Sequence, residues 1–221
     1  MTKRKKMTFW HRNGLSIVLL GLMLISIVLQ AYTGWKEYNN FLKEEGGQVL
    51  PFTQYLNSGH FLQATFENWE SEFLQMGLFV LLTVSLRQQG SAESKDLYEP
   101  EEVDREPVPS PRAPWPVRKG GWYLTVYQNS LSIALFLMFF ISLGLHLYGS
   151  WIDYNAEQSL KSEPSDTLLD FLTRTKFWFE SFQNWQSEFL SVFAIVVLSI
   201  FLRQKGSAQS KPVDTPNDEI E

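Results

Sequence analysis

The amino-acid sequence predicts an all-α membrane protein whose four transmembrane helices form two tandem parallel helical-hairpin repeats. Three observations predict this fold: two long uncharged segments, a shorter apolar segment after each of them, and an internal repeat covering most of the 221 residues. An apolar segment of about 20 residues is long enough to cross the hydrocarbon of a bilayer.

The first helix of each expected hairpin has the length and composition of a membrane span. These helices are expected at about residues 14–34 and 130–150, and the second of them carries His146 near its outer end. Trp35 and Trp151 follow the uncharged segments, where an aromatic side chain anchors at the membrane interface. A signal peptide is rejected for the first segment, because no small-residue cleavage site follows it and an equivalent segment recurs within the chain.

The second helix of each hairpin, expected at about residues 61–88 and 177–204, is less apolar. Its uncharged part is only about 14 residues long, which is short for a span. Arg87 and Arg203 end the two apolar runs, and an arginine there can reach the headgroup layer. We therefore expect both helices to cross the membrane, with an amphipathic outer end in the interface.

The repeat is visible when the chain is shifted by 116 positions, which places residues 13–95 over residues 129–211 without a gap. About 31 of the 83 aligned pairs are identical, and they include many polar positions. Because each copy contains two spans, both copies enter and leave on the same side. The repeats are therefore expected to be parallel and related by a pseudo-twofold axis along the membrane normal. A homodimer of a half-length ancestor is their natural origin.

The charge distribution predicts the orientation. Lys and Arg are more frequent in the N-terminal tail, the central linker and the C-terminus than in the two hairpin loops, which places both termini in the cytoplasm of a cell-membrane protein. The linker is first acidic and then proline-rich, a composition typical of an extended, mobile tether. The expected segments are a basic tail (1–12), repeat 1 (13–90), the linker (91–121), repeat 2 (122–206) and a C-terminal tail (207–221).

Two short motifs carry a family resemblance. They are FENWESEFLQ at residues 66–75 and GSAESK at residues 90–95. Through them the sequence resembles an uncharacterised family of bacterial integral membrane proteins with E-N-W-x-S-E-F-L and G-S-x-E-S-K motifs. The resemblance implies a bacterial cell membrane and no known activity. The second copy departs from it at Gln183 and Gln209, where glutamines replace glutamates, so these two charges are not needed twice.

Several classes of function lose support from what the sequence lacks. Without cysteine there are no disulfides, thiolate nucleophiles or cysteine-ligated metals. His11, His60 and His146 are too far apart for a metal-ligand motif, so no metal and no cofactor is expected. No catalytic or phosphate-binding motif is present, which predicts that the protein is not an enzyme. No sustained basic surface predicts a nucleic-acid partner.

Glu72 and Glu188 are the strongest candidates for a polar site at the outer membrane boundary. Asn68 and Asn184 lie one helical turn before them on the same face. An acid at that depth is costly and is a functional hypothesis by default. Paired across the pseudo-twofold axis, the two glutamates could bind a cation or a proton.

Gln30 and His146 occupy equivalent positions in the outer half of the first helices and could face these glutamates. The alternative is structural. The polar side chains would then fix helix packing or face water, while Trp69 and Trp185, with Trp35 and Trp151, anchor the helices at the interface.

The sequence therefore favours a structural or accessory, non-enzymatic membrane component. Its expected partners are the lipid bilayer and either a second copy or another membrane protein. The competing hypothesis is a small cation or proton channel or transporter that uses the paired outer glutamates. A membrane-embedded enzyme ranks third.

Overall fold

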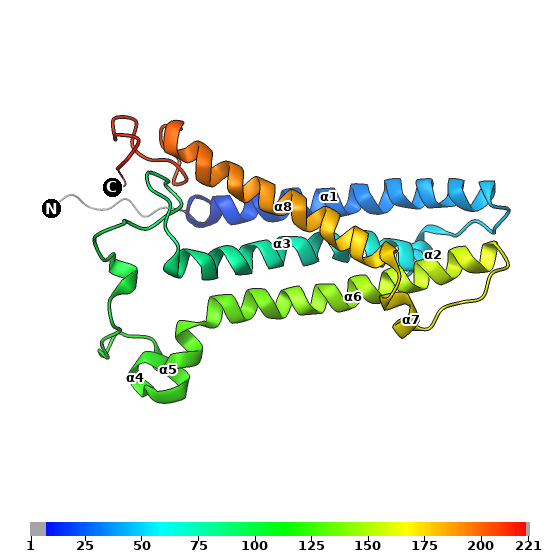
Figure 1. Cartoon of the computed structure of the whole chain (residues 1–221), viewed down its shortest axis with the longest axis horizontal. Coiled ribbons are helices and arrows are strands. Elements are labelled where there is room, and N and C mark those ends of the chain that lie inside the picture. Colours follow the sequence, from blue (N-terminus) through cyan, green and yellow to red (C-terminus); the bar gives the residue numbers. More distant parts are fainter. Residues whose placement is uncertain (1–7, 220–221) are drawn as a thin grey trace. The chain divides into compact units, whose positions relative to one another are not determined.

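The computed structural model describes residues 8–219, and all regular secondary structure in that range is helical (Figure 1). The basic cluster expected at residues 3–6 lies outside the described residues. The elements in chain order are α1 (Phe9–Glu44), α2 (Phe52–Tyr55), α3 (Gly59–Ser85), the 3₁₀ helix η1 (Glu102–Asp104), α4 (Trp115–Lys119), α5 (Gly121–Gln128), α6 (Ser130–Leu160), α7 (Leu168–Leu172) and α8 (Thr175–Phe201).

Three helices of the described range, α1, α6 and α8, are long and apolar enough to cross a membrane. The helix α3 has the same length as α8, 27 residues, but is not among them. The difference is compositional, because α3 has Gln75, Gly77 and Ser85 where α8 has Ser191, Phe193 and Phe201.

The chain divides into two compact units, each described by itself. The first unit holds the chain up to Thr65 together with Leu145–Thr173, and the second holds Phe66–Gly144 and Arg174–Glu221. The first unit thus contains α1, α2, α7, the start of α3 and the later part of α6.

Two glycines bring helix backbones together in the first unit. A Cβ atom on Gly149 of α6 would lie 2.6 Å from the backbone nitrogen of Gln63, and one on Gly59 would lie 2.5 Å from the backbone nitrogen of Asp153. Only glycine permits such an approach, which is typical of close helix pairs in membranes. The start of α3 is therefore held directly against α6.

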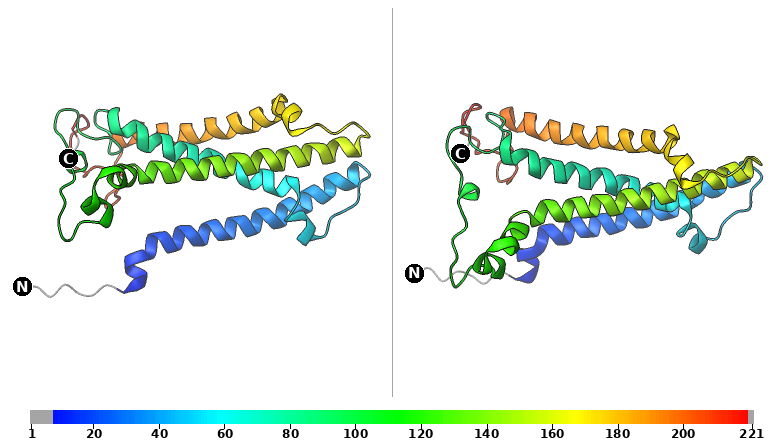
Figure 2. Two further views of the ribbon diagram at one scale, coloured as in Figure 1. Left: turned by 90° about the horizontal axis from the view of Figure 1, so that it is seen from below. Right: turned by 60° about the horizontal axis from the view of Figure 1, so that its bottom comes forward.

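The second unit packs the later part of α3 against the first part of α6 and against α8. A Cβ atom on Gly77 would lie 3.2 Å from the Phe136 ring. The Phe139 and Trp185 rings have centroids 6.4 Å apart. The helices α3 and α8 end at the same end of this unit, where α6 begins (Figure 2).

Candidate functional site

In the first unit, a pair of side chains on α1 holds the loop that follows it. Trp35 Nε1 and Asn39 Nδ2 donate to the carbonyl oxygen of Leu50 at 2.7 and 2.9 Å. The backbone nitrogen of Leu50 donates to Asn39 Oδ1 at 2.7 Å. We call these three bonds the loop clasp.

The same clasp occurs 116 positions later in the same unit. Trp151 Nε1 and Asn155 Nδ2 donate to the carbonyl oxygen of Asp166 at 2.8 and 3.0 Å, and the Asp166 nitrogen donates to Asn155 Oδ1 at 2.8 Å. The indole nitrogens of Trp35 and Trp151, which were expected to anchor at the membrane interface, therefore bind loop carbonyls. The sequence did not reveal this role.

Arginine-centred loops follow α3 and α8 in the second unit. The Arg87 guanidinium donates at 3.0 to 3.3 Å to the carbonyls of Thr83, Val84, Leu86 and Asp96. The Arg203 guanidinium donates at 3.1 to 3.4 Å to the equivalent carbonyls of Ser199, Ile200, Leu202 and Pro212. Each arginine thus satisfies carbonyls that the end of its helix leaves free.

The first part of the linker, up to Asp104, and the C-terminal tail make hydrogen bonds at these loops, although the linker was expected to be extended. Lys95 forms an ion pair with Asp104, and this hydrogen bond lowers the pKa of Asp104 below its ordinary value. Lys211 instead donates to three backbone carbonyls of the tail at 2.9 to 3.1 Å. Arg203 also donates to the carbonyl of Thr215 at 2.9 Å. Local hydrogen bonds therefore connect parts of these segments to the arginines at the ends of α3 and α8.

Acidic side chains gather where α3 meets α8 in the second unit. Glu70 is fully buried and accepts a hydrogen bond of 2.8 Å from Trp185 Nε1. Trp185 was expected to be an interfacial anchor, whereas its polar atom binds within the helix interface. Trp69, its equivalent in α3, is 36% exposed and packs edge-on against Phe66.

The structure brings Glu72 and Glu188 together. Their carboxyl groups are close enough to interact electrostatically, with Glu72 exposed and Glu188 half-buried. Two ionised carboxylates this close repel each other, so their proximity favours a proton on one of them or a cation between them. The two glutamates that the sequence singled out therefore form an acidic pair between α3 and α8.

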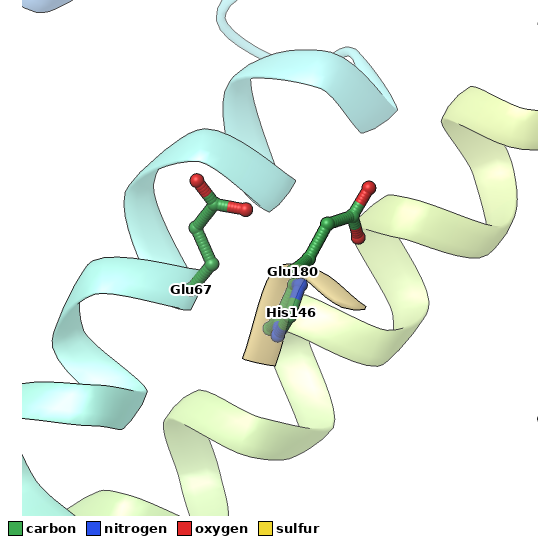
Figure 3. Close-up of side chains that lie close together, drawn as sticks. All are labelled: Glu67, His146 and Glu180. Carbon is green, nitrogen blue, oxygen red and sulfur yellow. The ribbon is translucent and has the colours of Figure 1, made fainter. Parts of the chain in front are cut away.

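A second acidic pair lies nearby on the same two helices. Glu67 of α3 extends toward Glu180 of α8, and each offers a carboxylate oxygen within 4.8 Å of the other (Figure 3). Two oxygens at this separation can ligate one cation. His146, the third side chain drawn in Figure 3, belongs to the first unit, where it is fully buried.

The remaining polar candidates have other positions. Asn184 Nδ2 donates to the backbone carbonyl of Glu180 at 3.0 Å, not to a carboxylate. Asn68 is exposed on α3. Gln30 Nε2 donates to Thr65 Oγ1 at 3.5 Å in the first unit, a weak bond between helices of the kind that supports packing.

The sequence analysis missed Glu67, Glu70 and Glu180. A usable signal was present for Glu70, because it lies four residues before Leu74 and seven before Gly77, a spacing that places all three on one helix face. The structure shows that this face of α3 is the buried one.

One further contact joins the loops after α3 and α8. With the Gln209 amide turned so that its nitrogen donates, both carboxylate oxygens of Glu93 accept from it. Gln209 is the equivalent of Glu93 under the 116-residue shift, as Glu188 is of Glu72. Two pairs of equivalent positions therefore meet, one on α3 and α8 and the other in the loops that follow them.

Comparison with known proteins places the chain in a family. The chain belongs to the family described as "Domain of unknown function (DUF6766)", which matches residues 6–221. Comparison with curated proteins found no match, and comparison with solved structures found none either.

Proposed function

We propose, for this member of a family of unknown function, a non-enzymatic four-span membrane protein that binds a proton or a small cation between Glu72 and Glu188. Its two tandem hairpins span a bacterial cell membrane with both termini in the cytoplasm. The geometry thus favours the proton or cation hypothesis over the structural role that the sequence favoured.

The proposed architecture is supported by local agreement between the hairpins. The helices α3 and α8 begin at equivalent residues, Gly59 and Thr175, and end at equivalent residues, Ser85 and Phe201. The loop clasp and the arginine-centred loop recur with the same bonds. Contacts between equivalent positions are expected at a pseudo-twofold axis that runs between α3 and α8. We infer from this agreement that α3 spans the membrane as α8 does.

The observation that carries the function is the close approach of the Glu72 and Glu188 carboxyl groups between α3 and α8. Both residues begin the apolar part of their helices, where an unneutralised acid is costly. A shared proton or a bound cation removes much of that cost. The Glu67–Glu180 pair lies about 8 to 12 Å away along the helix axes, at 1.5 Å per residue. The two acidic pairs thus provide two successive sites for a proton or cation along the interface between α3 and α8.

Infrared difference spectroscopy on the purified protein tests the proton. We expect a band from a protonated carboxyl group that is lost in Glu72→Gln and in Glu188→Gln, because either change leaves one carboxyl without its acidic partner. Glu44→Gln, at the exposed end of α1, is the matched control and should keep the band. A spectrum that both site variants leave unchanged would refute the proton form of the proposal.

Flux through proteoliposomes then separates binding from transport. A pH-sensitive dye inside the vesicles should report proton entry that the double variant Glu72→Gln/Glu188→Gln abolishes. If sodium or potassium moves instead, the cation form of the proposal holds. Flux that survives the double change excludes these two glutamates from the pathway.

A structural or accessory role is the second candidate, and the paired loop clasps favour it. Bonds that fix a loop to its own helix add rigidity at the hairpin ends without creating a path for a solute. This role predicts that the double glutamate variant differs from the wild type in its assembly or abundance in the membrane. Neither the wild type nor the variant should show vesicle flux.

A further inference from the structure

The helices α4 and α5 form a compact hairpin directly before α6. Gly120 and Gly121 join them with φ angles of 69° and 58°, a left-handed turn that favours glycine. Figure 1 shows this hairpin at the end of the second unit where α6 begins.

Aromatic rings surround a lysine on this hairpin. The Lys119 ammonium lies 5.0 Å from the centroid of the Trp115 ring and 4.2 Å from that of the Tyr123 ring, so it makes two cation–π contacts. Trp122 stacks on Tyr123 with centroids 4.0 Å apart. Trp115 is nevertheless 53% exposed and Trp122 is 66% exposed. Two indole rings on one small hairpin are thus left for another surface to cover.

The charge of this region has one sign. Residues 107–152 contain Arg112, Arg118 and Lys119 and no acidic residue, whereas the part of the linker before residue 107 is rich in acids. The hairpin is therefore a basic, aromatic segment and matches a negatively charged surface.

The hairpin ends at the point where the apolar part of α6 starts. Asn129 Nδ2 donates to the carbonyl of Thr125 at 2.8 Å, and Ser130 Oγ donates to the carbonyl of Tyr127 at 2.8 Å. These bonds satisfy carbonyls at the end of α5, so the chain can turn into α6 at a polar boundary. The start of α1 has a similar composition, with Phe9 and Trp10 each 68% exposed and Arg12 one turn from Phe9.

We propose that the α4–α5 hairpin lies in the headgroup layer of the bilayer and binds anionic lipid headgroups through Arg118 and Lys119. Trp115 and Trp122 fill the interfacial level, where indole rings place an apolar body against acyl chains and a polar edge against water. The guanidinium and ammonium groups reach the lipid phosphates from the same surface. The inference rests on the membrane placement proposed above. It assigns a lipid-binding surface that is separate from the proposed site at Glu72 and Glu188.

The test uses the full chain, which contains no cysteine. Val126, exposed on α5, is changed to cysteine and labelled with a dye whose emission shifts to shorter wavelength away from water. The labelled protein is reconstituted in nanodiscs of phosphatidylcholine alone or mixed with phosphatidylglycerol. We expect a shift to shorter wavelength in the anionic discs that about 1 M salt largely reverses, because that concentration shortens the screening length to about 3 Å.

Adding Arg118→Gln and Lys119→Gln should remove most of the difference between the two disc types. Lys205→Gln, which removes a cation from the loop after α8, is the matched control and should keep the difference. Equal emission in both disc types would overturn anionic-lipid binding, and water-like emission in both would overturn the headgroup placement. Failure to enter discs at all would instead contradict the membrane placement, so the two proposals fail in distinguishable ways. Salt reversal in the labelled Val126→Cys protein does not depend on the folding of the Arg118 and Lys119 variants.

Discussion

The two hairpins agree where side chains bind backbone and differ where side chains meet each other. The loop clasp binds the nitrogen and carbonyl oxygen of Leu50 in one hairpin and of Asp166 in the other. An apolar and an acidic residue serve equally well, because their side chains take no part in these bonds.

The helix faces of the second unit show the opposite behaviour. Glu70 is fully buried and binds Trp185, whereas its equivalent in α8, Gln186, is exposed. Hydrogen bonds from side chains to backbone atoms therefore keep the same local geometry when the residue that accepts them changes. The side chains on equivalent helix faces differ, because each face packs against a different neighbouring helix.

The largest expected effect tests this divergence at Glu70. Changing Glu70 to Ala leaves the Trp185 N–H without its acceptor in a buried interface, which should lower the free energy of unfolding by about 1–3 kcal/mol. The matched change Gln186→Ala, at the equivalent exposed position, should stay within about 0.5 kcal/mol of the wild type. Chemical denaturation in detergent micelles measures both. Similar losses at the two positions would contradict the assigned difference between the helix faces.

A smaller effect tests the agreement of the clasps. Asn39→Ala and Asn155→Ala each remove two hydrogen bonds to a loop backbone, so each should lower the free energy of unfolding by about 1–2 kcal/mol. Thermal unfolding measures the two losses, which should agree within about 0.5 kcal/mol. Asn40→Ala is the control, because Asn40 is exposed and the second hairpin has Ala156 at that position. A loss confined to one hairpin would show that the two clasps are not equivalent.

The smallest effect distinguishes the loops after α3 and α8 by their response to pH. Lys95 pairs with the carboxylate of Asp104, whose pKa is lowered first by that hydrogen bond and then by one from the Glu101 backbone. A lowered pKa in the folded state gives stability that is present above the ordinary Asp value and is lost as the pH falls through the lowered value. The loop around Lys211, held by backbone carbonyls, should not respond in this window.

Carbon-13 titration of labelled Asp104 measures this effect. The titration midpoint should lie below the ordinary value of 3.8 and return toward it in Lys95→Gln. The protection factors of amides near Lys95 should fall as the pH falls through this range, while those near Lys211 stay constant. An unshifted midpoint in the wild type would contradict an ion pair between Lys95 and Asp104.

The helices themselves could be predicted from the sequence because their apolar segments are long. Their ends could not. The helix expected to reach residue 88 ends at Ser85, because the Arg87 side chain turns back to bind carbonyls of the last turn. The helix expected to reach residue 204 ends at Phe201, where Arg203 does the same. Such endings depend on where a long side chain folds, which no local periodicity records.

The candidate site was only partly predictable for a related reason. Glu72 and Glu188 stand out because each acid begins an apolar run. Glu70 does not stand out, because its burial depends on which face of α3 meets α8. The sequence of one helix shows where its acids lie along the axis. Which of these acids is buried depends on the neighbouring helix.

The contacts between equivalent positions have a consequence for how such a chain can evolve under the proposed duplication. In a symmetric dimer of half-length chains, Glu93 would face its own copy and two negative charges would repel each other. Once the copies are joined, a substitution on one side of the axis is no longer imposed on the other. Gln209 now supplies an amide donor to Glu93. The Glu72–Glu188 crossing has kept its two acids, so fusion has allowed one crossing to be neutralised while the other keeps the acid pair proposed as the binding site.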